Sequence, residues 1–217
     1  MIIFDCNGVL VDSEQIAAEV AADELARAGI TVTPELMIRY LSGRRPADVF
    51  ASIEKISQRK LPANFGTTVA KATVKRLRAD LRAIAHAAYA LTWLRGPKCV
   101  ASSSPPERIR ASLETAGLAR FFKFVFSASD VPNGKPAPDL FLHAAARMGV
   151  QPADCIVVED SAAGVTAATA ADMTAIGFVG ASHAGFQLGE ELKSAGARMI
   201  VADLRHLKSA VVALRGW

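Results

Sequence analysis

The stretch FDCNGVLVDSE, residues 4–14, decides how the rest of the sequence is interpreted. It continues the apolar run MII (1–3), which predicts a short buried strand that ends at Asp5. Gly8 follows three residues later and allows a tight turn in which backbone amides can approach an anion. We therefore expect a carboxylate at the end of a buried strand, with the side chain of Asn7 close by.

Further short apolar runs alternate with helical patterns along the chain. They are KCVASS (98–103), FKFVFSA (122–128), CIVVED (155–160), MTAIGFVG (173–180) and RMIVAD (198–203). Continuous apolar strands separated by helices are typical of a parallel sheet that is covered on both faces. The sequence therefore predicts an α/β fold with a doubly wound, Rossmann-like parallel sheet.

Residues 14–82 differ because their pattern is helical throughout and no strand interrupts it. A connection of this length between two strands indicates an insertion, since such connections are usually short. We expect a helical cap domain over 14–82 and an α/β core domain formed by 1–13 and 83–217. Asp12 is predicted to cap the first helix of the insertion, with Gln15 completing a capping box.

The composition excludes several classes of protein. The 217 residues have a net charge of only +4 and 6% aromatic residues, and none of the aromatic residues interleave with the basic segment KATVKRLRADLR (71–82), which argues against nucleic-acid binding. No apolar run approaches the roughly 20 residues of a membrane span. Three cysteines without CxxC spacing are typical of buried, reduced thiols. We expect a cytoplasmic protein without membrane or nucleic-acid partners, and a monomer is compatible with the sequence.

Polar residues follow four of the predicted strands at the point where each strand ends. In an open parallel sheet, ligands bind beyond the carboxyl ends of the strands, so these residues should lie together. Two carboxylate-bearing strand ends favour Mg²⁺, and a lysine with hydroxyl groups nearby favours a phosphate group. In chain order the residues are Asp5 and Asn7, then Ser102, Ser103 and Ser104, then Lys135, then Glu159 and Asp160.

The motifs DCNGVLVDSE, VASSS, GKPAPDLF and VVEDSAAGVTAATAADM resemble the four ordered motifs of the haloacid dehalogenase-like hydrolase superfamily. The similarity is greatest to the branch of β-phosphoglucomutase and small sugar-phosphate phosphatases, whose members have a helical cap after the first motif. The resemblance spans nearly the whole core. It implies a Mg²⁺-dependent enzyme that acts on a small phosphorylated metabolite.

The resemblance also implies roles for the residues at the strand ends. Asp5 would be the nucleophile that accepts the phosphoryl group. Asp160 would bind Mg²⁺ together with Asp5 and the backbone carbonyl of Asn7, and Glu159 would support the metal directly or through water.

For the phosphate group, the resemblance implies that Ser102 and Ser103 bind phosphoryl oxygens. Lys135 would balance the negative charge around the nucleophile and the phosphate.

Asn7 departs from the family pattern, in which an aspartate acts as general acid and then as general base. An amide cannot transfer a proton at neutral pH, and losing such a group lowers the rate by about 10²- to 10⁴-fold. Deliberate replacement of aspartate and natural divergence both remain open as explanations. The family's dehalogenases and phosphonate hydrolases also lack this aspartate, but VVEDS and GVLVDSE favour phosphate esters.

The sequence analysis leaves three functions open. The first is a phosphatase that acts on a sugar or sugar acid phosphate through an aspartyl-phosphate and is impaired by Asn7. The second is a phosphoglucomutase-type transfer, and the third is a catalytically silent phosphate-binding or regulatory protein. For substrate specificity we expect Arg44 or Arg45, in the cap segment SGRRP (42–46), and His183, which follows the fifth predicted strand.

Overall fold

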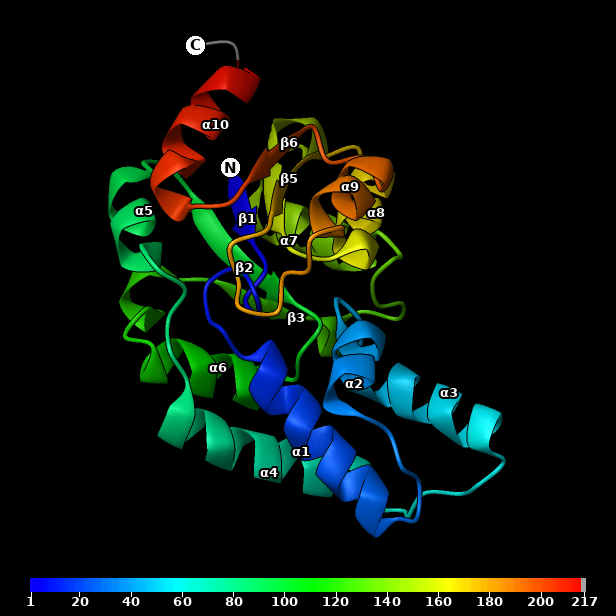
Figure 1. Cartoon of the computed structure of the whole chain (residues 1–217). Helices are drawn as coiled ribbons and strands as arrows, with labels where there is room; N and C mark the ends of the chain where they lie inside the picture. The colour runs from blue at the N-terminus through cyan, green and yellow to red at the C-terminus, as the bar shows by residue number, and fades with distance from the viewer. Residues whose placement is uncertain (216–217) are drawn as a thin grey trace.

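The computed structural model describes residues 1–215, in which six parallel strands form one sheet in the order β3-β2-β1-β4-β5-β6 (Figure 1). This order reverses direction at β1, as in doubly wound nucleotide-binding folds, and the prediction of that fold is confirmed. The strands are β1 (Ile2–Phe4), β2 (Lys98–Ser102), β3 (Val125–Ser127), β4 (Ile156–Glu159), β5 (Thr174–Phe178) and β6 (Met199–Val201).

Helices cover both faces of the sheet. Because side chains alternate along a strand, Ile2 and Phe4 of β1 point to one face and Ile3 points to the other. The first face packs on α5 (Ala87–Trp93), α6 (Pro106–Thr115) and α10 (Leu207–Arg215), and the second on α7 (Asp139–Met148), α8 (Ala162–Ala170) and α9 (Leu188–Ser194). Short 3₁₀ helices are η1 (Ala119–Phe121), η2 (Ala128–Asp130), η3 (Pro152–Asp154) and η4 (Leu204–His206).

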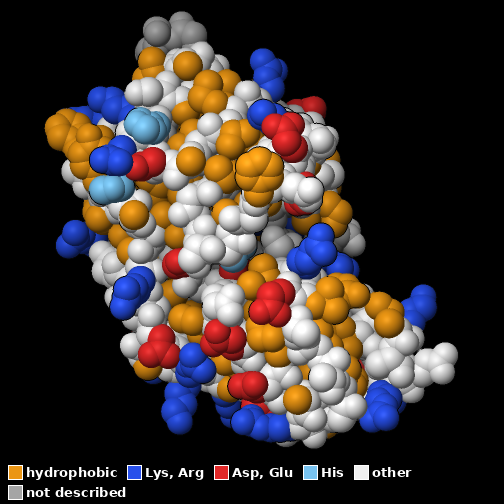
Figure 2. Space-filling view, viewed as in Figure 1, with side chains coloured by type: hydrophobic (Ala, Val, Ile, Leu, Met, Phe, Trp, Pro, Cys, Tyr) orange, Lys and Arg blue, Asp and Glu red, His pale blue; other side chains and the backbone are white. Residues whose placement is uncertain are grey.

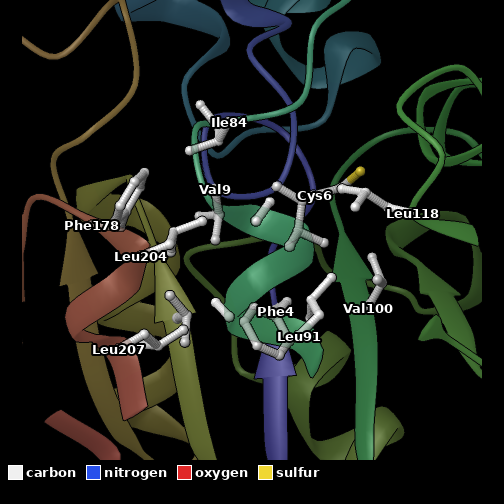
Figure 3. Packing of buried hydrophobic residues seen from close by; sticks show 14 of the residues in the cluster. Phe4, Cys6, Val9, Ile84, Leu91, Val100, Leu118, Phe178, Leu204 and Leu207 are labelled. Atoms are coloured by element: carbon white, nitrogen blue, oxygen red, sulfur yellow. The ribbon is translucent and has the colours of Figure 1, made fainter. Parts of the chain in front are cut away.

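The core of the first face gathers around Phe4 (Figure 3). The Phe4 ring is 1% exposed and meets the edge of Phe122 with 5.9 Å between ring centroids. Leu91 of α5 and Leu207 of α10 pack in the same cluster. Burial on both faces explains why β1 is a continuous apolar run, and it fixes the position of the residue that follows.

Five helices lie between β1 and β2 in the described residues, and we refer below to the first four as the inserted helices. They are α1 (Glu14–Arg27), α2 (Pro34–Leu41), α3 (Pro46–Ser57) and α4 (Phe65–Asp80). They pack around a hydrophobic cluster of their own, which includes Leu25, Met37 and Phe50. In Figure 1 they lie beyond the carboxyl ends of the strands. No helix in residues 1–215 has the length and apolar character needed to cross a bilayer.

The start of α1 differs from the prediction. Ser13 occupies the N-cap position without a side-chain capping bond, and the Gln15 amide donates to Glu19 instead of closing a capping box. Asp12 accepts hydrogen bonds from the backbone N–H and the hydroxyl of Ser182, at 3.3 and 2.8 Å. The capping prediction is therefore wrong, because a partner distant in sequence binds the Asp12 carboxylate.

Candidate active site

The topology places the two predicted carboxylates at the point where the strand order reverses. Asp5 directly follows β1, and its backbone N–H donates to the carbonyl of Val158 in the neighbouring β4, at 3.0 Å. Asp160 directly follows β4. Ligands bind at such switch points because the loops diverge there and leave a crevice. Asp5 and Asp160 line one cavity of about 20 Å³, as predicted from their places at the strand ends.

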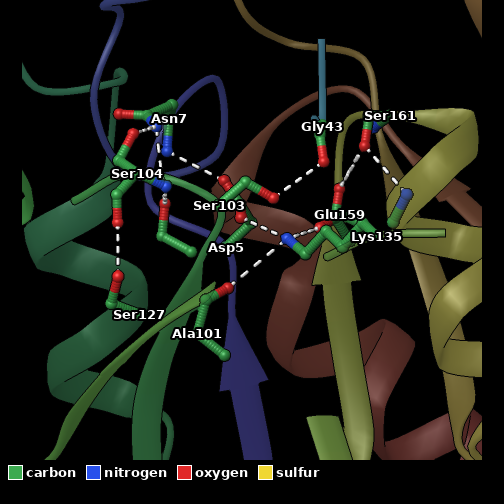
Figure 4. A network of polar contacts seen from close by, with 12 residues as sticks. Asp5, Asn7, Gly43, Ala101, Ser103, Ser104, Ser127, Lys135, Glu159 and Ser161 are labelled. Carbon is green, nitrogen blue, oxygen red and sulfur yellow. Dashed lines mark hydrogen bonds and ion pairs between the residues drawn. The ribbon is translucent and has the colours of Figure 1, made fainter. Parts of the chain in front are cut away.

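The buried Lys135 forms ion pairs with two of the predicted carboxylates, Asp5 and Glu159 (Figure 4). Its Nζ lies 2.5 Å from Oδ1 of Asp5, forms a second ion pair with Glu159, and donates to the carbonyl of Ala101 at 3.4 Å. The side chain is fully buried. Burial acts to lower the pKa of Lys135, but the charges of Asp5 and Glu159 outweigh it and raise that pKa. Lys135 therefore remains a cation beside the nucleophile candidate.

Glu159 makes its contacts inside this cluster. One carboxylate oxygen pairs with Lys135, and the other accepts from the backbone N–H and the hydroxyl of Ser161, at 3.2 and 2.9 Å. Ser161 in turn accepts from the N–H of Gly164, which makes it the N-cap of α8. Glu159 thus orients Lys135, and direct binding of a metal by Glu159 stays a prediction.

The crowding of Asp5 and Asp160 suits a cation. Burial is the main cause of the raised pKa of Asp5, and the charges of Glu159 and Asp160 raise it further against the opposing effect of Lys135. Burial also raises the pKa of Asp160 to about 6. A divalent cation bound between the two carboxylates would lower the pKa of both Asp5 and Asp160. Carboxylate oxygens are also the ligands that Mg²⁺ prefers.

The donor set for such a cation would consist of two carboxylates and a backbone carbonyl. Within residues 1–215, no group of three or more Asp, Glu, His or Cys side chains is arranged to hold a metal. The third protein ligand would therefore come from the main chain at Asn7, as the sequence resemblance implies. Gly8 allows the main chain to pass close to the Asp160 carboxylate. Its φ is +76°, and an added Cβ would lie 1.7 Å from Oδ2 of Asp160.

Both the backbone and the side chain of Asn7 form hydrogen bonds (Figure 4). Its backbone N–H donates to Asp5 Oδ2 at 2.9 Å. The side-chain amide donates to the hydroxyls of Ser104 at 2.8 Å and Ser102 at 3.4 Å, and it accepts from Ser13 at 3.0 Å. The backbone of Asn7 therefore contacts the Asp5 carboxylate and Asn7 lines the same cavity, but its side-chain amide has no titratable proton to transfer.

The loop between α2 and α3 closes the cavity. Gly43, with φ +69°, approaches the core so closely that an added Cβ would lie 2.1 Å from the Ser161 hydroxyl. The Ser103 hydroxyl donates to the carbonyl of Gly43 at 2.8 Å. Ser103 also lines the cavity, and phosphate binding by its hydroxyl stays a prediction. The volume of about 20 Å³ is close to the room that one water needs, which is less than a phosphate ester occupies.

The two adjacent arginines of this loop point to different surroundings. Arg44 lines the cavity with Asp5, in agreement with the expected position. Arg45 instead donates to the carbonyls of Ala128, Val131 and Pro132, at 3.4, 3.4 and 3.0 Å. Arg45 thus connects the inserted helices to the core. It is absent from the lining of this cavity but lines a neighbouring one of about 230 Å³, and its contact with a substrate stays a prediction.

His183 lies beside Asp160. Its Nε2 is 3.2 Å from Asp160 Oδ2, and its side chain is 5% exposed. Burial acts to lower the pKa of His183, but the neighbouring carboxylate outweighs it and raises that pKa. His183 and Arg44 also line an open cleft of about 870 Å³ between α2 and the loop after β5. Figure 2 shows the surface indented where the inserted helices meet the rest of the molecule.

Two charged residues that line the cavity were missed by the sequence analysis. Glu14, the first residue of α1, and Arg108, in the first turn of α6, both line the cavity with Asp5. Arg108 follows β2 by six residues and therefore belongs to the same edge of the sheet as the predicted serines. Its position just beyond a strand end is a signal that could have identified it.

Comparison with known proteins shows extended similarity. A family model described as haloacid dehalogenase-like hydrolase matches residues 1–172. The chain is 31% identical to 6-phosphogluconate phosphatase of Escherichia coli over 184 residues, covering 84% of this chain and 83% of the relative. It is 32% identical over 177 residues to fructose-1-phosphate phosphatase YqaB of the same organism, covering 81% of this chain and 94% of the relative. The crystal structure of a haloacid dehalogenase-like protein of unknown function from Agrobacterium tumefaciens superposes with a TM-score of 0.82 and 37% identity, covering 99% and 98% of the two chains.

Proposed function

Because this chain belongs to the haloacid dehalogenase-like hydrolase family, we propose that it is a Mg²⁺-dependent phosphatase of a small sugar or sugar acid phosphate. In this proposal Asp5 accepts the phosphoryl group, and Asn7 limits the rate. The observation that supports it is the cluster in which Lys135 contacts the buried Asp5 carboxylate while Asn7 lies beside it. The broader prediction, a phosphoric monoester hydrolase, is confirmed by the family match and the curated relatives.

The substrate class is proposed from two of the relatives. They are named for their action on 6-phosphogluconate and fructose 1-phosphate, a sugar acid phosphate and a sugar phosphate. We propose that residues 14–82 act as a cap domain and that 1–13 with 83–217 form the core domain. The separate hydrophobic cluster of the inserted helices supports this division, and so does the cavity that lies under their α2–α3 loop.

The first step depends on Asp5 and Lys135. An Asp5 carboxylate oxygen forms a bond to phosphorus while the bond from phosphorus to the ester oxygen breaks. Lys135 holds Asp5 through Oδ1 and keeps a positive charge beside the phosphoryl group. Mg²⁺, when bound by Asp5, Asp160 and the carbonyl of Asn7, would offset the charge of the phosphoryl group.

The residue at position 7 of this site cannot transfer a proton. The leaving alkoxide needs a proton, and the water that hydrolyses the aspartyl-phosphate must lose one. Asn7 lies where such a group is needed, and its amide can do neither. Hydroxyl groups rotate, so Ser102 and Ser104 could donate to a carboxylate at position 7 as readily as they accept from the present amide. We therefore expect Asn7→Asp to fit without rearrangement.

Steady-state kinetics of the parent and of Asn7→Asp test the proposal. With Mg²⁺ and a panel of sugar and sugar acid phosphates, Asn7→Asp should raise kcat/KM by about 10²-fold or more. Asp5→Asn in the Asn7→Asp background serves as the control and should abolish the gain. If Asn7→Asp binds phosphate esters but hydrolyses none of them, the proposal is wrong, and a phosphate-binding protein, suggested by the amide at position 7, takes its place.

A further inference from the structure

A buried pair of opposite charges next to Asp5 is incompletely bonded. Nη2 of Arg108 lies 3.7 Å from Oε1 of Glu14, and the two side chains are 11% and 9% exposed. This distance exceeds that of a hydrogen bond, which is about 2.7–3.2 Å for nitrogen and oxygen. Nε and Nη2 of Arg108 are buried and have no hydrogen-bond partner among residues 1–215.

Such an arrangement is costly for a folded protein. Buried charged groups are stabilised when hydrogen bonds replace those lost to water, and a guanidinium with two unpaired nitrogens does not meet that condition. The other buried cation in this region, Lys135, contacts two carboxylates and a carbonyl. The contrast indicates that Arg108 and Glu14 retain bonding capacity for a third group that bridges them from one side.

A molecule bound at the active site would supply that group. Arg108 and Glu14 line the same cavity as Asp5, and Arg108 also lines a neighbouring cavity of about 230 Å³ between the inserted helices and α6. A phosphate ester bound at Asp5 would place its leaving group in the space that these two residues line.

The pair of charges restricts the chemistry of that leaving group. A carboxylate or second phosphate would be attracted by Arg108 but repelled by Glu14, and a cation would meet the opposite pair of effects. A hydroxyl group satisfies both residues, because its oxygen accepts from the guanidinium while its proton is donated to the carboxylate. We propose that Glu14 and Arg108 bind a hydroxyl of the leaving group and select phosphate esters of polyols. This inference rests on the proposed function and assigns the residues that recognise its substrate.

Matched esters test the assignment in the Asn7→Asp background. A hexitol phosphate carries hydroxyl groups, and n-hexyl phosphate has a carbon chain of the same length without them. The ratio of kcat/KM for the two esters should fall by about 10- to 100-fold in Arg108→Met and in Glu14→Gln, the usual effect of losing a hydrogen bond to a charged group. Arg110→Met, an exposed position on the same helix, is the control and should leave the ratio unchanged.

The possible results separate this assignment from other roles of Arg108. An equal loss on both esters would overturn it and place Arg108 on the phosphoryl group itself or in the stability of the fold. An unchanged ratio would show that the pair does not touch the leaving group. If Arg108→Met lowers the melting temperature, the ratio is taken from Glu14→Gln instead, because glutamine keeps the shape of the side chain. A reduced ratio in Glu14→Gln then supports the assignment, and an unchanged ratio overturns it.

A binding measurement distinguishes failure of this inference from failure of the proposed function. Calorimetric titration of the parent chain with each ester, in Mg²⁺, requires no turnover. Tighter binding of the hexitol phosphate, with a preference that Arg108→Met reduces at least about tenfold, supports the inference even if Asn7→Asp hydrolyses neither ester. Equal affinities in parent and variant would reject it even if both esters are hydrolysed.

Discussion

Replacing Lys135 by methionine tests the physical basis of the active site. Methionine has a similar length but no charge, so the change leaves the carboxylates of Asp5 and Glu159 buried without their cation. Both are nearly or completely inaccessible, at 5% and 0% exposure. Removing one partner of a buried ion pair costs about 3–5 kcal/mol, because the remaining charge is left unpaired. The cost here should be at least at the lower end of that range, since one cation serves two carboxylates.

Urea unfolding in the presence of a chelator measures this cost. In thermal unfolding, the same loss of free energy would lower the melting temperature by about 6–20 °C for a chain of this size. Lys193→Met is the matched control: Lys193 pairs with Glu190 at 2.9 Å, but the two side chains are 57% and 78% exposed. A surface pair of this kind contributes at most about 1 kcal/mol.

A double variant shows whether the unpaired charge is the cause. Adding Glu159→Gln to Lys135→Met should recover part of the lost stability, because one of the two buried charges is removed. The reasoning is refuted if Lys135→Met destabilises the protein by less than about 1 kcal/mol, or no more than Lys193→Met does.

Further predictions concern the metal site and the contact between the inserted helices and the core. Gly8→Ala should lower stability by about 1–2 kcal/mol from its positive φ alone and weaken Mg²⁺ binding, because the new Cβ would displace the Asp160 carboxylate; unaltered calorimetric Mg²⁺ affinity would contradict this. Asp160→Ala should abolish Mg²⁺ binding in the same titration, whereas equal affinity in variant and parent would remove Asp160 from the site. Arg45→Ala should increase the radius of gyration measured by X-ray scattering, because three hydrogen bonds to core carbonyls are lost, and exposed Lys55→Ala should not; an identical radius in both would show that Arg45 does not hold the inserted helices.

Much of the fold and the catalytic centre was predictable from local pattern. Continuous apolar runs that end in acidic residues indicate buried parallel strands, and the parallel arrangement brings their carboxyl ends to one edge. Asp5 and Asp160 could therefore be placed together although they are far apart in the sequence. Thr33 and Ser161 are residue types that favour N-cap positions, and the hydroxyls of both accept backbone hydrogen bonds there.

Side-chain direction and distant partners could not be predicted in this way. Arg44 and Arg45 are adjacent and chemically identical, yet only the structure shows that one lines the cavity and the other binds core carbonyls. Asp12 has the pattern of a helix cap, but its partner Ser182 lies in a loop far along the chain. The place of Arg108 just beyond a strand end was a usable signal, but its pairing with Glu14 of α1 was not, because the two residues are far apart in the sequence.

Mass spectrometry of a quenched reaction tests the role of Asp5 and Asn7 most directly. The parent and Asn7→Asp are mixed with Mg²⁺ and an activated aryl phosphate, whose leaving group needs little protonation. We predict a phosphoryl group on the peptide that contains Asp5, with a lifetime at least about 10²-fold longer in the parent, because its Asn7 cannot activate the hydrolytic water. Turnover without a phosphoryl group on Asp5, or equal lifetimes in the two proteins, would contradict the proposed mechanism.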